Sequence, residues 1–119
     1  MNEPLVSVNL TTYNRAHLLP QALDSVLAQS YTNLDIIVVD DCSQDDTTEV
    51  VWQYQQQDAR IKYFRHDENK GNACARNTAL HHCIGYYVAF MDDDDEWIDF
   101  EKIREEVEQF QMLSNNVGI

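Results

Sequence analysis

The sequence has few basic residues, no cysteine pair of the CxxC type and no long apolar stretch. Eight lysines and arginines stand against 21 aspartates and glutamates, and the formal net charge is -13. This balance disfavours a general nucleic-acid binder, which needs a basic surface, and disfavours docking to an anionic membrane. No run approaches the ~20 apolar residues of a membrane span, and the first residues lack the basic start and apolar region of a secretory signal. The composition therefore predicts a soluble, acidic protein with carboxylates available for metal ions.

Cysteine is also scarce, with three residues, Cys42, Cys74 and Cys83. An odd count without close pairs predicts small buried side chains in a reducing cytosol, rather than disulfides, a zinc site or a nucleophile. The expected location is the cytoplasm, which includes the cytoplasmic face of a membrane.

What the sequence does contain is a regular alternation of strand-like and helix-like segments. With 119 residues, of which 44% are hydrophobic, the chain suits one small domain or a piece of a larger one. Apolar β-branched runs indicate strands, and apolar residues at helical spacing indicate helices. Their order predicts an α/β fold, a mostly parallel sheet with helices on both faces. The predicted strands span residues 5–10, 34–39, 61–65 and 86–91, the helices span residues 19–27, 46–54, 73–84 and 100–110, and residues 115–119 look like the start of a fifth strand.

Several local signals accompany these elements. Asp46, followed three residues later by Glu49, resembles a capping box at the start of the second helix. Gly85 is well placed to end the third helix. The four histidines show no convincing ligand spacing and are predicted to lie on the solvated surface; they are His17, His66, His81 and His82.

Three polar loops, two of them rich in acidic residues, follow the first, second and fourth predicted strands, at residues 11–15, 40–46 and 91–97. In an open parallel sheet the ligand lies beyond the carboxyl ends of the strands, near the point where the strand order reverses. We therefore expect these three loops to meet at one site.

The most conspicuous of these loops holds four consecutive aspartates, Asp92 to Asp95. Carboxylates crowded at a strand end suit a hard divalent cation such as Mg²⁺ or Mn²⁺, held together with substrate phosphates. The structural alternative is an acidic first turn before the helix that carries Phe100, where negative charge is favourable. Because the four aspartates directly follow a buried strand, we favour the interpretation that they bind a metal ion and a diphosphate.

Two other stretches carry candidate binding residues. Asp41, next to Asp40 at the end of the second strand, is placed to accept hydrogen bonds from a base or a ribose. Gly71 allows close backbone approach at a helix start, where an anion is welcome. Arg76, further into that helix, could reach a phosphate or pair with one of the aspartates.

Taken together, four stretches resemble the nucleotide-sugar-binding half of family 2 glycosyltransferases, which have the GT-A fold. They are VSVNLTTYNR, LDIIVVDDCSQDDT, RIKYFRHDENKGNACARNTAL and YYVAFMDDDDEW, in family order and at family-like spacing from about Val6 to the chain end. The resemblance implies that residues 1–119 form the Rossmann-like nucleotide-binding part of a GT-A domain.

The same resemblance implies roles for individual residues. The pair Asp92 and Asp94 matches the family's DxD motif, with Asp94 the direct metal ligand and Asp93 close to the ribose or the metal. The implied metal is Mn²⁺ or Mg²⁺, bridging the diphosphate of a nucleotide sugar, commonly a UDP-sugar. The remaining nucleotide-binding residues implied are Thr11, Tyr13, Asp41 and Arg76.

By the same resemblance the enzyme inverts the anomeric centre, and a carboxylate base takes the proton of the acceptor hydroxyl on a sugar or glycan. In the family that base lies well downstream of the DxD motif. We therefore expect the catalytic base beyond residue 119, in an acceptor-binding half, and we expect this chain to bind donor but to turn it over poorly. An unpaired sheet edge would also favour association between copies.

Three alternatives remain open at this point. A receiver domain has a similar length and binds Mg²⁺, but its acid pair follows the first strand, and no phosphate-pairing lysine ends a late strand here. A nucleotidyltransferase would favour a glycine-rich, basic loop after the first strand, which TTYNRAH is not. A non-catalytic cation- or nucleotide-binding module is not excluded, because fold alone does not fix function.

Overall fold

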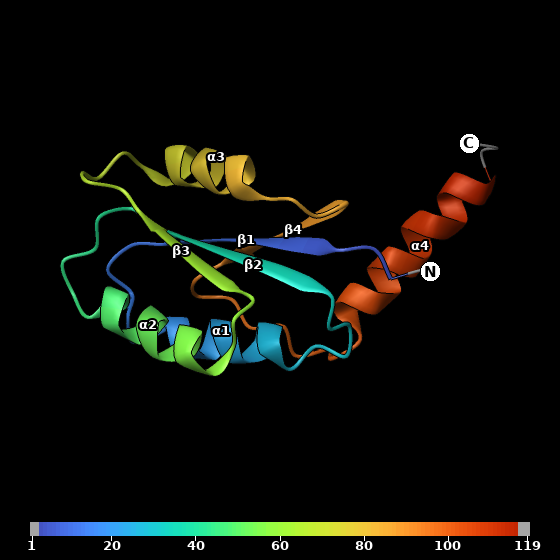
Figure 1. Cartoon of the computed structure of the whole chain (residues 1–119), viewed down its shortest axis with the longest axis horizontal. Helices are drawn as coiled ribbons and strands as arrows, with labels where there is room; N and C mark the ends of the chain where they lie inside the picture. Colours follow the sequence, from blue (N-terminus) through green and yellow to red (C-terminus); the bar gives the residue numbers. More distant parts are fainter. Residues whose placement is uncertain (1–2, 117–119) are drawn as a thin grey trace.

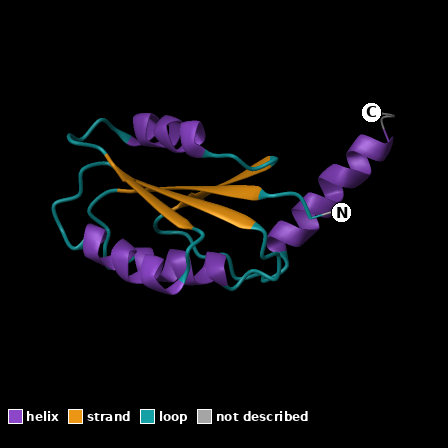
Figure 2. Cartoon of the chain, viewed as in Figure 1, coloured by secondary structure: helices purple, strands orange, loops and turns teal. Residues whose placement is uncertain are grey.

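The computed structural model describes residues 3–116, which form an α/β fold around a parallel sheet (Figure 1, Figure 2). Its four strands lie in the order β3-β2-β1-β4, and every neighbouring pair is parallel. In chain order the elements are β1 (Val6–Thr12), α1 (Leu19–Leu27), β2 (Leu34–Asp40), α2 (Thr47–Gln57), β3 (Ile61–Arg65), α3 (Asn72–His82), β4 (Tyr87–Asp92) and α4 (Lys102–Asn116).

The two central strands explain why the sheet needs helices on both faces. Every residue of β1 and of β2 is buried. In Figure 1, α3 lies over one face of the sheet, while α1 and α2 lie over the other. A strand covered on both sides favours a continuous apolar run, and the run from Ile36 to Val39 is of that kind. The predicted fold class is confirmed.

The core divides into a large layer under α1 and α2 and a small layer under α3. In the small layer, Ile37 and Val39 of β2 meet Ala75 and Ala79 of α3. Alanines on the inner face let this helix come close to the sheet. Because α3 contacts β1 and β2, the side chain of Phe90 in the edge strand β4 stays half exposed. Association of copies through such an edge remains a prediction.

The strand order reverses direction at β1, which has β2 on one side and β4 on the other. In the register, Thr12 lies opposite Asp40, and Thr11 lies opposite Asp92. The loops that follow β1, β2 and β4 therefore leave the sheet side by side, at the switch point where ligands of open α/β sheets bind.

The predicted start of α2 is confirmed in position, because Asp46 stands at the N-cap, but Asp46 makes no side-chain capping bond there. Its neighbour Asp45 does this work, because its Oδ1 accepts hydrogen bonds from the backbone nitrogen and the hydroxyl of Thr47. Its other oxygen accepts from the backbone nitrogen of Ala16 in the loop after β1, which ties two site loops together.

Three further expectations are corrected. The thiols are free, as expected, but Cys74 is exposed and the other two are only partly buried. The fifth strand is not seen in the part that the structure covers, since Asn115 and Asn116 continue α4 and the remaining residues of that prediction lie outside the described range. His66 is buried rather than solvated.

No helix among residues 3–116 is long and apolar enough to cross a membrane.

Gly85 does not end α3, which already stops at His82. Instead it lies against the start of β1, and a Cβ atom there would stand 2.5 Å from the backbone nitrogen of Ser7 and 2.9 Å from the carbonyl oxygen of Leu5. The backbone nitrogen of Gly85 also donates a hydrogen bond to Ser7 Oγ at 2.8 Å. The glycine is needed for this close approach of two backbone segments.

We therefore expect Gly85→Ala to lower the free energy of unfolding by about 1–3 kcal/mol, the usual cost of forcing extra volume into a packed site. Denaturant unfolding followed by circular dichroism measures this directly. An unchanged midpoint would mean that the chain shifts freely at this contact.

Candidate functional site

A cleft of about 430 Å³ opens at the carboxyl edge of the sheet, where the three loops were expected to meet. Its walls come from the loop after β1, the end of β2, the start of α3 and the acidic run after β4. Six of the seven residues predicted from the sequence to bind nucleotide or metal line it. The lining residues are Thr11, Thr12, Tyr13, Arg15, Asp41, Asn69, Gly71, Asn72, Ala75, Asp92, Asp93 and Asp94.

The seventh predicted residue, Arg76, lies beside this cleft rather than in it. It lines an adjoining hollow with Phe90, Met91, Asp92 and Asp95. Its guanidinium nitrogen is 3.7 Å from Asp92 Oδ1, and its guanidinium carbon is 5.9 Å from the centre of the Phe90 ring. The two hollows share Asp92, so Arg76 is poised at the border of the acidic run.

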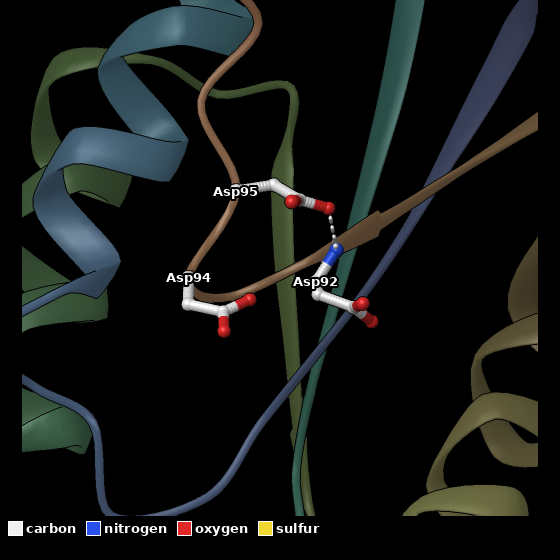
Figure 3. Close-up of side chains that lie close together, drawn as sticks. All are labelled: Asp92, Asp94 and Asp95. Carbon is white, nitrogen blue, oxygen red and sulfur yellow. Dashed lines mark hydrogen bonds between the residues drawn. The ribbon is translucent and has the colours of Figure 1, made fainter.

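Three aspartates of that run present carboxylates to solvent close together. Ligand oxygens of Asp92, Asp94 and Asp95 all lie within 4.8 Å of one another. Figure 3 shows them gathered around the end of β4, with Asp95 folded back so that its Oδ2 accepts a hydrogen bond from the backbone nitrogen of Asp92 at 3.2 Å. Exposed carboxylate oxygens at this spacing fit a hard divalent cation that keeps part of its water. Asp95 was not among the ligands predicted from the sequence.

Asp93, unlike these three aspartates, is buried. Its Oδ2 accepts hydrogen bonds from the hydroxyl of Thr12 at 2.9 Å and the backbone nitrogen of Tyr13 at 3.3 Å. Its Oδ1 accepts from the guanidinium of Arg15 at 3.0 Å, and the same nitrogen of Arg15 is 3.3 Å from Asp94 Oδ2. Asp93 thus fastens the loop after β1 to the acidic run, a contact that the sequence did not suggest.

Asp41 is a buried anion at the other part of the cleft wall. Its Oδ1 accepts hydrogen bonds from His66 Nδ1 at 2.8 Å and from the backbone nitrogen of Lys70 at 2.9 Å, and its Oδ2 accepts from the backbone nitrogen of Gly71 at 2.8 Å. Burial on its own would raise the pKa of the Asp41 carboxyl, but the N–H groups around it outweigh burial and the pKa lies below its ordinary value. The carboxylate is therefore ionised at neutral pH and can only accept hydrogen bonds.

The wall between these groups is formed by backbone and small polar side chains. Thr11 is buried and donates from its hydroxyl to Asn72 Oδ1 at 2.9 Å, whereas Tyr13 is partly exposed. Gly71 has φ +96°, a conformation open to glycine and strained for other residues, and a Cβ atom there would meet nothing within 4 Å. The start of α3 is thus open toward the cleft.

Sequence reasoning missed His66, Arg15 and Asp95. His66 directly follows β3, so the rule that strand ends converge on the site could have found it. The histidine spacings match no metal-ligand pattern, and on that ground the sequence predicted His66 to lie on the solvated surface. The pairing of Arg15 and the folded-back position of Asp95 depend on loop conformation, for which the sequence carries no periodic signal.

Comparison with known proteins assigns the chain to a family. Residues 7–115 match the profile of glycosyl transferase family 2. The chain belongs to this family. Among its curated relatives is the UDP-Glc:alpha-D-GlcNAc-diphosphoundecaprenol beta-1,3-glucosyltransferase WfgD of Escherichia coli, which is 40% identical over 118 residues, 99% of this chain and 45% of that protein. The GalNAc(5)-diNAcBac-PP-undecaprenol beta-1,3-glucosyltransferase of Campylobacter jejuni is 45% identical over 94 residues, 78% of this chain and 30% of that protein.

Solved structures of glycosyltransferases share the fold. The mannosyltransferase PcManGT from Pyrobaculum calidifontis, in complex with GDP-Man and Mn²⁺, superposes with a TM-score of 0.83 at 32% identity, covering 88% of this chain and 32% of that one. S. aureus TarS in complex with UDP superposes with a TM-score of 0.83 at 30% identity, covering 94% of this chain and 32% of that one. The family 2 chain described here thus spans less than half the length of these relatives. The assignment confirms the predicted resemblance to family 2 glycosyltransferases and rules out the alternative that the chain is a receiver domain.

Proposed function

We propose that residues 1–119 carry the donor-binding part of an inverting, metal-dependent glycosyltransferase that uses a nucleoside diphosphate sugar, with uridine as the nucleoside. One observation carries the proposal. A single cleft is lined both by a buried, ionised acceptor, Asp41, and by the exposed carboxylates of the acidic run. A nucleoside diphosphate needs both kinds of group, one for its base and one, through a cation, for its diphosphate.

The base end of the cleft is proposed to take uracil, because Asp41 is suited to accept a hydrogen bond from a ring N–H. Asp41 Oδ2 accepts one hydrogen bond, from Gly71, and a carboxylate oxygen can accept a second. Uracil presents a ring N–H between two carbonyls, which suits such an acceptor, whereas neutral cytosine presents a bare ring nitrogen there and would be repelled. Guanine also carries a ring N–H, which agrees with GDP-Man and UDP both occurring in solved relatives. Thr11 and Tyr13 are proposed to line the nucleoside pocket.

The diphosphate end is proposed to lie on the acidic run. Asp92 and Asp94 would hold Mn²⁺ or Mg²⁺, with Asp95 within reach of the same position. The cation, when bound, supplies positive charge that stabilises the departing diphosphate. Asp93 and Arg15 hold the loop after β1 against this run, and Arg76 is placed at its border to contact a phosphate oxygen.

The acceptor is proposed to be a sugar hydroxyl of a growing glycan. This follows from the relatives, whose names describe transfer of glucose to sugars on diphosphoundecaprenol. A carboxylate base would take the proton of that hydroxyl as it displaces the diphosphate. We assign no such base among residues 3–116.

Calorimetric titration of the chain with UDP, with and without Mn²⁺, tests the donor site. We expect binding to be about tenfold tighter or more with Mn²⁺, because the cation links two sets of anions that otherwise repel. CDP is the matched control, since it differs from UDP only in the base, and it should bind markedly more weakly. Equal binding of UDP with and without metal would contradict the role of the acidic run, and equal binding of UDP and CDP would contradict the role of Asp41.

A further inference from the structure

His66 lies behind the cleft wall, with both ring nitrogens in use. It follows β3 directly, and its backbone nitrogen donates to the carbonyl oxygen of Asp40 at 2.8 Å. Its Nδ1 lies 2.8 Å from Asp41 Oδ1, and its Nε2 lies 2.8 Å from the hydroxyl oxygen of Thr78 on α3. The side chain is 8% exposed, so solvent does not substitute for either partner.

The chemistry of the partners fixes where the ring proton sits. The ionised carboxylate of Asp41 can only accept, so Nδ1 must carry a proton. In neutral His66 the other nitrogen, Nε2, then accepts from the hydroxyl of Thr78. If the ring is protonated, that hydroxyl can turn and accept instead. The bond to Asp41 is therefore kept in both protonation states of the ring.

The loop that contains His66 wraps around one carboxylate. Three of its N–H groups converge on Asp41, from the ring of His66 and from the backbones of Lys70 and Gly71. The same loop supplies Asn69 and Gly71 to the cleft wall. Three donors hold the carboxylate in place, and Oδ2, which accepts from Gly71 alone among them, keeps a second acceptor position on a residue that lines the cleft.

We propose that His66 is a positioning residue for nucleobase selection: its ring N–H holds the Asp41 carboxylate turned so that one acceptor position meets the base of the nucleotide. The inference rests on the donor site proposed above. His66 itself does not line the cleft, so it acts through Asp41. Without its ring N–H, the buried carboxylate loses one of three donors, can rotate, and takes up a proton more readily. A protonated Asp41 could donate to cytosine, so the preference for UDP over CDP should shrink.

Two variants at this position separate positioning from a merely structural role. His66→Leu removes the donor and keeps an apolar side chain in a buried place. His66→Asn keeps an N–H at the position of Nδ1 but is too short to reach Thr78. UDP and CDP affinities are measured by calorimetry at saturating Mn²⁺, Mn²⁺ affinity is measured without nucleotide by electron paramagnetic resonance, and thermal unfolding of the free chain reports folding.

We expect His66→Leu to weaken UDP binding about tenfold, the usual effect of losing a hydrogen bond to a charged group. The ratio of UDP to CDP affinity should fall with it, Mn²⁺ affinity should not change, and His66→Asn should recover most of the loss. Independently of any nucleotide, ¹⁵N NMR of the free chain should show neutral His66 with its proton on Nδ1.

Several outcomes would overturn the inference. They are an unchanged UDP-to-CDP ratio in His66→Leu, equal losses in the leucine and asparagine variants, or a neutral ring with its proton on Nε2. If the wild-type chain fails to bind UDP at all, the proposed function falls and this inference with it, a result distinct from failure of the variants alone.

Discussion

Asp94→Asn is expected to abolish the Mn²⁺ dependence of UDP binding. Asp94 offers an exposed carboxylate within 4.8 Å of the ligand oxygens of Asp92 and Asp95. Asparagine keeps the shape and one oxygen but removes the charge that a hard cation prefers. Loss of residues that merely support a metal ligand typically costs about 10- to 100-fold in affinity, so loss of a ligand charge should cost about 100-fold or more.

Electron paramagnetic resonance measures the affinity for Mn²⁺, and calorimetry with UDP measures how far nucleotide binding depends on that ion. Glu108→Gln is the matched control, because it removes one negative charge from an exposed position in α4, which projects from the end of the sheet where the strands begin (Figure 1). The control should bind Mn²⁺ and UDP like the wild-type chain. If both variants lose Mn²⁺ to the same degree, net charge rather than ligation governs binding.

The second large effect is expected for Asp41→Asn, which should weaken UDP binding by about 10- to 100-fold. An amide in this place must put its NH₂ group at the position of one of the two carboxylate oxygens. At Oδ1 it would face the ring N–H of His66 and the backbone N–H of Lys70, and at Oδ2 it would face the backbone N–H of Gly71 and the base, so each choice sets a donor against a donor. Because the site is buried, an unsatisfied N–H group should also lower the free energy of unfolding by about 1–3 kcal/mol.

Asp35→Asn is the control that separates stability from binding. Asp35 is also a buried carboxylate of β2, but it lies at the opposite end of that strand, where it accepts from Ser7 Oγ at 3.0 Å and pairs with Lys62 Nζ at 2.8 Å. Asp35→Asn should lower the free energy of unfolding about as much as Asp41→Asn does, but it should retain UDP binding. Equal loss of UDP binding in both variants would show that binding merely follows stability.

The fold was predictable because burial on both sides of a strand leaves a strong sequence signal. The strand predicted at 61–65 and the helix predicted at 19–27 match β3 and α1 without change, and the other strands shift by one or two residues at one or both ends. Placement of the candidate site followed from the fold, since parallel strands bring Thr11, Asp40 and Asp92 to one edge.

What could not be predicted depends on side chains meeting across the sequence. Asp45 and Asp46 are chemically identical in the sequence, and only the loop conformation decides that Asp45 caps α2 and bonds Ala16. Gly85 follows a helix as a terminating glycine would, but its neighbour is Ser7, 78 residues away in the chain. His66 and Thr78 meet through the packing of α3, which no local pattern encodes.

The residues that stabilise the sheet and the residues that line the cleft lie in different parts of the chain, and this affects how its sequence can change in evolution. The apolar side chains that stabilise the sheet lie along β1 and β2, whereas the groups lining the cleft lie at the end of β1, in the loops after β1 and β2, around the start of α3 and in the run after β4. Substitutions in the loops can retune which base or phosphate is accepted at little cost to folding, while substitutions in the strands are constrained by packing alone. Related chains can therefore acquire new donors without rebuilding the scaffold.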